Sequence, residues 1–469
     1  MGRLALQLAF IVAGLNFMIL KVGDMLHCEA AYAIAMVFCV PAVVLGSISW
    51  WMVPSFSRSW PVIACVAIAW AGLVYSDPTR SNQGIVGAVW LTMTLPIAAL
   101  IVEHRCWWLC AKTYVVTSAV AMAMAVWVEY QMFGVTLLGS FQRFGKWVSD
   151  EGSRLANPNR VGGQLALAAV LALVLYLRSG KLARGKGVGT RGEGQQRCLA
   201  PRPSPLAPHF SIGWTVFLSL GCIMTASRAA FVAWLAGMAL LLYSARVHDS
   251  RKLRDMVAVS SVLSAAVLFL VFAVDFRPWR SLASRLDNPE HVLSASGRLT
   301  IWKASYDVWC SDRRHFLIGT GNGAASEAIG RQLRMTKSDG FTLLGMNAHS
   351  SFVEWGLSHG LLGMVAAALL GATVIRRVQQ QDRRAASTFR WAILLCFGLA
   401  SMNYVTYRDP IILAAGALIL SMVSRPAARI PVVGFARIQS NPATTRLVSQ
   451  ECSRMQGRLP SCESSYAEH

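Results

Sequence analysis

The chain has 469 residues, of which 55% are hydrophobic and 14% charged, and its mean hydropathy is +0.46. A soluble domain carries about a quarter charged residues, so this composition excludes an ordinary soluble protein and predicts that much of the apolar surface faces lipid. The net charge of +21 would suit nucleic-acid binding in a soluble protein. Because cytoplasmic loops of membrane proteins accumulate Lys and Arg, we expect no nucleic-acid partner here.

Apolar segments of a length suited to crossing a bilayer recur along the chain, and each is expected to form a helix. They fall at residues 4–20, 30–46, 60–76, 84–102, 107–130, 161–177, 210–226, 229–243, 256–275, 352–375, 391–405 and 411–424. The sequence therefore predicts an all-α polytopic membrane protein with about twelve transmembrane helices, forming one integral membrane domain over residues 1–469. The first segment is longer than the apolar part of a usual signal peptide, so we expect it to be retained. The eighth is short and could form one folded-back unit with the seventh.

Basic residues assign the connections to the two sides of the membrane. Lys and Arg gather within residues 178–209, after the eighth and tenth segments, and in the tail. With twelve spans, these regions and both termini fall on the same side, which is predicted to be the cytoplasm. We expect a flexible basic cytoplasmic loop at residues 178–209 and a disordered cytoplasmic tail at residues 430–469. The opposite side then receives the loop at residues 131–160 and a long loop at residues 276–350.

The long loop contains a segment with helical periodicity that begins near Arg298. The predicted apolar face of this helix is formed by Leu299, Trp302, Tyr306 and Trp309. Arg298 lies in the first turn, where a cation is unfavourable unless an anion also binds. A surface ion pair with Asp307 or Asp312 is the alternative explanation.

Two further features of the same loop could carry chemistry. Gly319, Gly321 and Gly323 predict a tight turn into a short helix, although successive backbone N–H groups there could also bind a phosphate. His349 closes the loop before the tenth helix, with Glu354 following. A lone His at a membrane interface is more often structural, but an imidazole that titrates near neutrality also suits a general base.

Two polar motifs lie outside the long loop. Ser227-Arg228 interrupts an apolar stretch, where an arginine is costly unless it snorkels to the interface or serves a function. Arg154 precedes Asn157-Pro158-Asn159, which predicts a turn and helix cap at the start of the sixth span. Neither motif is specific when taken alone.

In combination, these motifs resemble the O-antigen ligase and polymerase superfamily of bacterial envelope glycosyltransferases, over residues 154–375. The resemblance is carried, in order, by Arg154, Asn157-Pro158-Asn159, Ser227-Arg228-Ala229, Ser296-Gly297-Arg298 with Trp302, Gly319-Thr320-Gly321, Ala348-His349-Ser350 with Glu354, and Gly360-Leu361-Leu362-Gly363. The chain departs from the family pattern at two positions. Ser350 stands where the family often has Asn, and His359 stands where it commonly has an acid.

The resemblance implies an enzyme of the bacterial inner membrane that transfers a glycan from undecaprenyl diphosphate on the periplasmic face. In a ligase the acceptor is the lipid A-core, and in a polymerase it is a growing polysaccharide. The resemblance assigns the catalytic base to His349 and binding of the diphosphate to Arg228 and Arg298. Arg154 matches a less constant arginine with the same role. Supporting roles are expected for Asn159, Gly319, Gly321 and Glu354.

The chemistry that these residues could perform agrees with that assignment. Glycan transfer releases a diphosphate whose negative charge grows in the transition state, and no Asp-x-Asp motif occurs in the chain to hold a metal for that purpose. We therefore expect no metal or other cofactor, with arginines neutralising the charge and direct displacement inverting the anomeric centre. Two alternatives stay open. One is an O-antigen or exopolysaccharide polymerase, and the other is a transporter of lipid-linked glycan or polysaccharide.

Overall fold

The structure is a computed structural model, and every regular element in the part of the chain that it describes is a helix. It describes residues 1–25, 30–52, 60–74, 81–133, 158–184, 207–248, 261, 298–336, 348, 350–381, 388–402 and 411–423. The helices are α1 (Gly2–Met25), α2 (Ala30–Met52), α3 (Trp60–Val74), α4 (Ser81–His104), α5 (Trp107–Phe133), α6 (Pro158–Arg184), α7 (Ala207–Met224), α8 (Arg228–His248), α12 (Arg298–Trp309), α13 (Arg313–Ile318), α14 (Ala325–Thr336), α15 (Ser351–Gln381), α16 (Thr388–Ser401) and α17 (Ile411–Val423).

The predicted apolar segments coincide with helices wherever the structure describes them. Four helices are long and apolar enough to cross a membrane by length and composition, and seven shorter apolar helices accompany them. Together they match eleven of the predicted segments, so the all-α prediction is confirmed for the described residues. The remaining segment, at residues 256–275, lies outside the described residues apart from Ser261. The count of twelve spans therefore stays a prediction.

Several boundaries differ from those predicted. α6 continues to Arg184 and α7 already begins at Ala207, so both helices extend into the basic loop expected at residues 178–209. α5 likewise runs to Phe133, inside the loop expected at residues 131–160. The seventh and eighth segments are two separate helices joined by a three-residue turn. The apolar periodicity located each helix, but it could not show how far polar side chains at the ends continue the helix.

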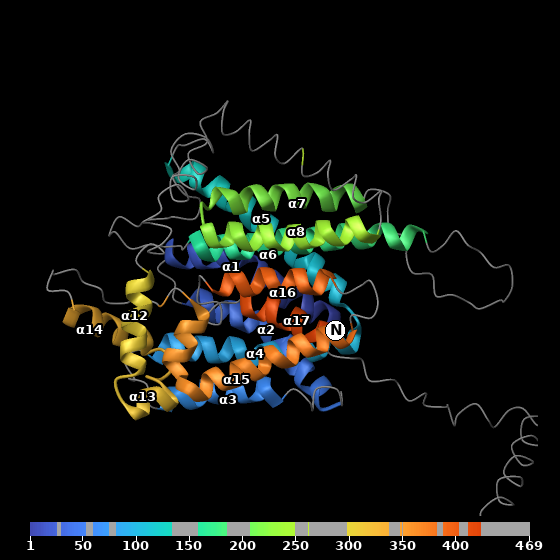
Figure 1. Cartoon of the computed structure of the whole chain (residues 1–469). Coiled ribbons are helices and arrows are strands. Elements are labelled where there is room, and N and C mark those ends of the chain that lie inside the picture. The colour runs from blue at the N-terminus through green and yellow to red at the C-terminus, as the bar shows by residue number, and fades with distance from the viewer. Residues whose placement is uncertain are drawn as a thin grey trace, which may run out of the picture. The chain divides into compact units, whose positions relative to one another are not determined.

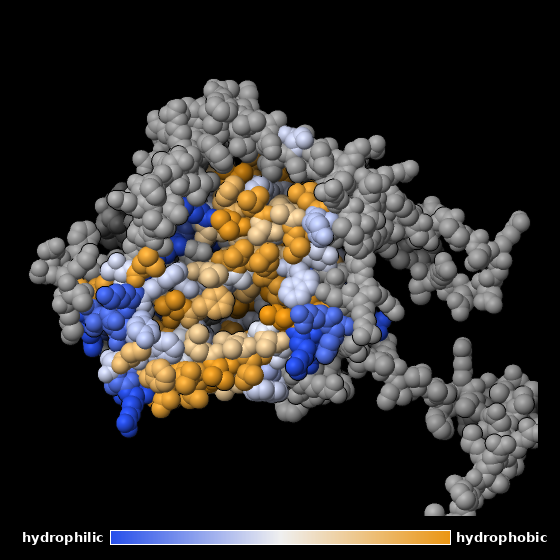
Figure 2. Space-filling view, in the orientation of Figure 1, coloured by the Kyte–Doolittle hydropathy of each residue, from blue (hydrophilic) through white to orange (hydrophobic). Residues whose placement is uncertain are grey.

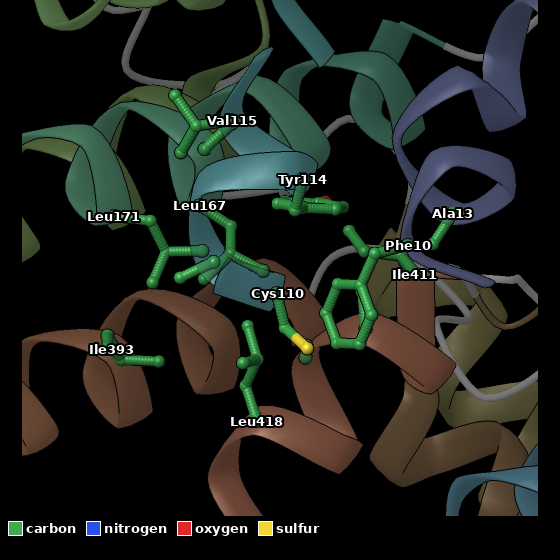
Figure 3. Packing of buried hydrophobic residues seen from close by; sticks show 14 of the residues in the cluster. Phe10, Ala13, Cys110, Tyr114, Val115, Leu167, Leu171, Ile393, Ile411 and Leu418 are labelled. Carbon is green, nitrogen blue, oxygen red and sulfur yellow. The ribbon is translucent and has the colours of Figure 1, made fainter. Parts of the chain in front are cut away.

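The chain divides by its internal contacts into Met1–Arg425 and Pro426–His469. The second unit, which contains the whole of the tail predicted to be disordered, lies outside the described residues. In the first unit, α6 packs on α7, α8 and α16, and α1 packs on α2 and α5 (Figure 1). Side chains from α1, α5, α6, α16 and α17 fill a common apolar core. Figure 3 shows Phe10, Tyr114, Leu167, Ile393 and Leu418 converging in it.

Helix ends that were predicted to share one side of the membrane are in contact. The start of α6 meets the start of α8 through a hydrogen bond between Ser227 and Asn159. At the opposite predicted side, Gly2 of α1 lies against His104 at the end of α4. There too, the Trp107 indole of α5 donates to the Leu418 carbonyl of α17 at 3.1 Å. These pairings follow the up-and-down order that was deduced from basic residues.

The described part of the long loop forms three short helices, α12, α13 and α14. The predicted helix from Arg298 is confirmed, but only half of its predicted apolar face is, because Trp302 and Trp309 pack against the apolar cluster of the loop whereas the other two residues do not. Leu299 and Tyr306 are 51% and 61% exposed. The face that packs is shifted by about one residue and is formed by Ile301, Ala304, Ser305 and Val308. These smaller side chains let α12 approach α14 and α15 closely, where they meet Ile329 and Leu357.

Candidate functional site

The site is built at the start of α8, where a tight turn follows α7. Thr225 and Ala226 end α7 with hydrogen bonds to carbonyls of the preceding turn, and Ala226 takes a left-handed φ of 46°. Such a φ is uncommon for a residue with a side chain, so the turn is held by its surroundings. The Ser227 hydroxyl then accepts a hydrogen bond from the Ala230 amide at 3.4 Å, in the manner of a helix cap. Arg228 is thereby fixed as the first residue of α8, and it is half-buried.

Asn159 ties this turn to α6. The Ser227 hydroxyl donates to the Asn159 side-chain oxygen at 2.8 Å. Gly162, one turn further along α6, allows the close approach, because a Cβ atom there would lie 2.6 Å from the Thr225 hydroxyl oxygen and 2.7 Å from the Ala230 Cβ. The motif beginning at Pro158 therefore holds the helix end that carries Arg228.

Arg298 opens α12 and lies within electrostatic reach of Arg228. Burial lowers the pKa of Arg298 below its ordinary value, and the positive charge of Arg228 lowers it further. The two arginines lie 70 residues apart in the sequence, yet each occupies the first position of a helix. Helix N-termini carry partial positive charge, so the two side chains and the two helix ends add to one positive region. A site of this kind suits an anion with several oxygens, such as a diphosphate.

The backbone at Ala348, directly before His349, is held next to the helix of Arg298. Its carbonyl accepts from the Trp302 indole of α12 at 2.9 Å, and its amide donates to the Glu354 carboxylate at 3.0 Å. Trp302 is one helical turn after Arg298, and residues four apart share a helix face. Glu354 is fully buried and lies in the first turn of α15. Two polar side chains that flank the site thus fix the chain on the N-terminal side of the proposed base.

The glycines of the long loop have a structural role in the described fold. Gly319, Gly321 and Gly323 all have left-handed φ values, of 78°, 96° and 98°. The amides of Thr320 and Gly321 donate to the Leu357 and Ser358 carbonyls of α15, at 2.9 and 3.0 Å. These amides are engaged within the protein, so the tight-turn interpretation is favoured over a phosphate cradle.

α15 itself breaks where the glycine turn meets it. Gly360 has a φ of 62° and a ψ of −157°, which interrupts the helix after His359. The break leaves carbonyls of the preceding turn without their usual partners four residues on, and the amides of the glycine turn satisfy two of them. The loop and the broken helix therefore form one interlocked unit that supports Ala348.

Asn322 was not singled out in the sequence and proves to be a central contact. Its side-chain amide donates to the Ala69 carbonyl of α3 and the Gly84 carbonyl of α4, at 3.2 and 3.0 Å. Its backbone amide donates to the Gly72 carbonyl at 2.9 Å. An Asn between two glycines is typical of a turn, so the sequence carried no signal that this side chain is buried and bridges two helices.

The structure brings together Arg228, Arg298, Asn159 and Glu354 with the glycine turn, all at one end of the bundle. Arg154 and His349 lie outside the described residues. Among the residues described, no group of three or more His, Cys, Asp or Glu side chains is placed to hold a metal ion.

Residues 214–368 match the model of a protein family described as O-antigen ligase. This match confirms the predicted family resemblance. It supports the O-antigen ligase and polymerase superfamily, and it includes Arg228, Arg298, His349 and Glu354 but neither Arg154 nor Asn159. None of the curated proteins compared with the chain matches it. The family match and the apolar helices together indicate a multi-pass protein of the bacterial inner membrane with an O-antigen ligase or polymerase type of function.

Proposed function

We propose that this protein is an O-antigen ligase-like glycosyltransferase, which transfers a glycan from undecaprenyl diphosphate to a lipid A-core acceptor at the periplasmic face. The observation that carries the proposal is the approach of Arg228 and Arg298, each at the start of a helix, close enough for the charge of one to lower the pKa of the other. Bringing two cations together beside two helix N-termini is unfavourable in an empty site and becomes favourable when a polyanion binds.

In the proposed reaction, the acceptor hydroxyl oxygen attacks the anomeric carbon of the lipid-linked glycan. The new carbon–oxygen bond forms as the bond to the diphosphate oxygen breaks, which releases undecaprenyl diphosphate and inverts the anomeric centre. Arg228 and Arg298 stabilise the charge that develops on the diphosphate, each charge-assisted hydrogen bond contributing about 1.5–3 kcal/mol. Arg154 is proposed to assist them from the loop at residues 131–160. No metal is required in this scheme.

His349 is the proposed general base, which takes the proton from the acceptor hydroxyl. The contacts of Ala348 with Trp302 and Glu354 support this role, because they fix the residue before it beside the arginine-bearing helix. Proton transfer by a positioned side chain typically contributes a factor of about 10² to 10⁴ in rate. Glu354, Asn159, Gly319 and Gly321 act through the backbone and helix ends that they hold.

The test uses purified protein in nanodiscs with lipid-linked glycan and lipid A-core, and without nucleotide or added metal. We expect the glycan to appear on the acceptor, and we expect His349→Ala to lower the rate by at least about 10²-fold in a correctly inserted protein. An unchanged rate in that variant would show that His349 is not the base. Movement of the glycan across the membrane without bond exchange would support a transporter instead.

A polymerase of O-antigen or exopolysaccharide would use the same residues, so a strain that lacks the protein separates the two functions. Free lipid A-core together with intact lipid-linked polymer indicates a ligase. Single repeat units attached to the core indicate a polymerase.

A further inference from the structure

α13 is a short helix that exposes apolar and basic side chains together. None of its six residues is buried. Phe316 and Leu317 are 41% and 48% exposed, and Arg313 and Arg314 at its start are exposed as well. An exposed aromatic and aliphatic pair beside two arginines is costly in water. The same combination is typical of helices that lie in the interface of a membrane, with apolar groups among the acyl chains and cations at the headgroups.

The exposed arrangement is held in place by other side chains. The Trp309 ring stacks on Phe316, with centroids 5.6 Å apart and an angle of 21° between the rings. The Trp309 indole donates to the Phe316 carbonyl at 3.0 Å. At the start of the helix, the Asp312 carboxylate accepts from the His315 amide at 2.8 Å and lies 2.6 Å from His315 Nδ1. The helix is therefore preformed, with Asp312 turned toward the helix backbone.

Contacts with α15 fix the position of α13 along the membrane normal. A Cβ atom on Gly360 would lie 2.5 Å from the Leu317 carbonyl carbon and 2.6 Å from the Ile318 amide nitrogen. The end of α13 therefore rests on the break in α15. From that break to Arg376, where charged residues begin at the other end, residues 360–376 span about 24 Å. The hydrocarbon core of a bilayer is about 30 Å thick, so with Arg376 at one boundary the break, and α13 against it, lie within about 6 Å of the other boundary.

The apolar surface of α13 is continuous with that of the spanning helix. Leu361 and Leu362, immediately after the break, are 38% and 56% exposed on a helix that is long and apolar enough to cross a membrane. Figure 2 shows the hydrophobic surface along α3 and α15 reaching the end where α13 lies, and hydrophilic residues gathering there. Lipid that contacts Leu361 and Leu362 would therefore also contact Phe316 and Leu317.

We infer that α13 is an interfacial anchor, which inserts Phe316 and Leu317 among the outer-leaflet lipids and binds anionic phospholipid headgroups through Arg313 and Arg314. By holding the loop at the bilayer surface, the anchor keeps Arg298, on the neighbouring helix α12, at the level of a diphosphate whose lipid tail lies in the membrane. The anchor itself is separate from the arginine pair, and only its effect on Arg298 rests on the proposed function.

The test measures how deeply α13 lies in the bilayer, and it uses the full-length protein. In a background with Cys310→Ser, which removes the exposed cysteine that directly follows α12, Leu317→Cys is labelled with an environment-sensitive fluorophore and placed in nanodiscs with spin-labelled lipids. We expect quenching by labels at the headgroup and upper acyl chain. Arg331→Cys on α14, whose side chain is 64% exposed, is the matched control and should not be quenched. The signal from the background protein, labelled without an added cysteine, is subtracted.

The role of lipid charge is tested by composition and by substitution. Quenching at Leu317 should rise when phosphatidylglycerol replaces part of the phosphatidylcholine, and Arg313→Gln with Arg314→Gln should abolish that rise. Absence of quenching at Leu317 would overturn the anchor, including the case in which the probe is shielded by a second copy of the chain. If quenching at Leu317 changed neither with lipid charge nor on substitution of the two arginines, the headgroup site would be overturned. Neither readout depends on glycan transfer.

Discussion

At the scale of single residues, the protein places like charges together. Arg228 and Arg298 come from helices that are distant in sequence, and each was predicted as a functional arginine from the family resemblance and because an arginine is costly at its position. In the structure, burial and the positive charge of Arg228 both lower the pKa of Arg298, so the two arginines lie within electrostatic reach of each other. One bound polyanion would interact with both guanidinium groups, whereas a surface ion pair would account for only one of the two arginines.

The arginine pair leads to a prediction that separates binding from stability. Arg298→Gln removes the repulsion with Arg228, so we expect the melting temperature of the empty protein to be no lower than that of the wild type. The same variant should lose about 10- to 100-fold in kcat/KM, because a charge-assisted contact to the diphosphate contributes about 1.5–3 kcal/mol. Arg298→Lys should recover only part of this loss, since lysine keeps the charge without the forked geometry.

The control for the arginine prediction is a double-mutant cycle with Arg228→Gln, measured by transfer rate and by thermal unfolding with and without inorganic diphosphate. Residues that bind one ligand should show non-additive losses in rate. Additive losses, or a destabilised empty protein, would mean that each arginine serves its own structural contact.

The sequence located most residues of this site but not the contacts that hold them. Costly arginines and the glycines could be recognised because their chemistry is unusual for their positions. Asn322 could not, and Trp302 was recognised only through the family resemblance, because a turn Asn and an apolar Trp are ordinary residues until their amide and indole groups are seen to contact distant parts of the chain. Asp312, which was considered as a partner of Arg298, instead caps α13.

At the scale of elements, the broken helix α15 joins the membrane part of the chain to the loop. Gly360 permits the break, and the glycine turn supplies amides to the carbonyls that the break leaves open. The sequence predicted one helix here because the apolar pattern continues across Gly360, and periodicity carries no information about a single left-handed φ. For α12, periodicity predicted the helix and two of its packed residues, Trp302 and Trp309, but it missed the smaller side chains that are buried between them.

Gly360→Ala tests the break, with Gly371→Ala in the same helix as a matched control. Alanine at position 360 would have to adopt a left-handed φ and would press on the Leu317 and Ile318 backbone, whereas a Cβ at Gly371 meets nothing within 4 Å. We expect Gly360→Ala to lower the free energy of unfolding by more than about 2 kcal/mol. Gly371→Ala should leave it unchanged or raise it by up to about 1 kcal/mol. Thermal unfolding in detergent measures both, and equal behaviour of the two variants would contradict the proposed interlock.

At the scale of the whole molecule, the helix ends that the positions of Lys and Arg assign to one side of the membrane are also the ends that contact each other. The turn before α8, the start of α6, the end of α3 and the start of α4 were all assigned to one side from the positions of Lys and Arg. The structure joins them through Ser227 and Asn322. Arg228 at the start of α8 lies near Arg298, so α8 and α12 begin at the same end of the bundle.

Cys310 offers a direct test of the side, because it is exposed at the end of α12 while the other cysteines in the described residues are buried. If the site faces the periplasm, a membrane-impermeant maleimide should label Cys310 in intact spheroplasts, and Cys310→Ser should remove that labelling. An added cysteine at the exposed Arg376, beyond the far end of the apolar part of α15, should react only after the membrane is permeabilised. The reverse pattern would place Arg228 and Arg298 in the cytoplasm, where a glycan carried on the outer leaflet could not reach them.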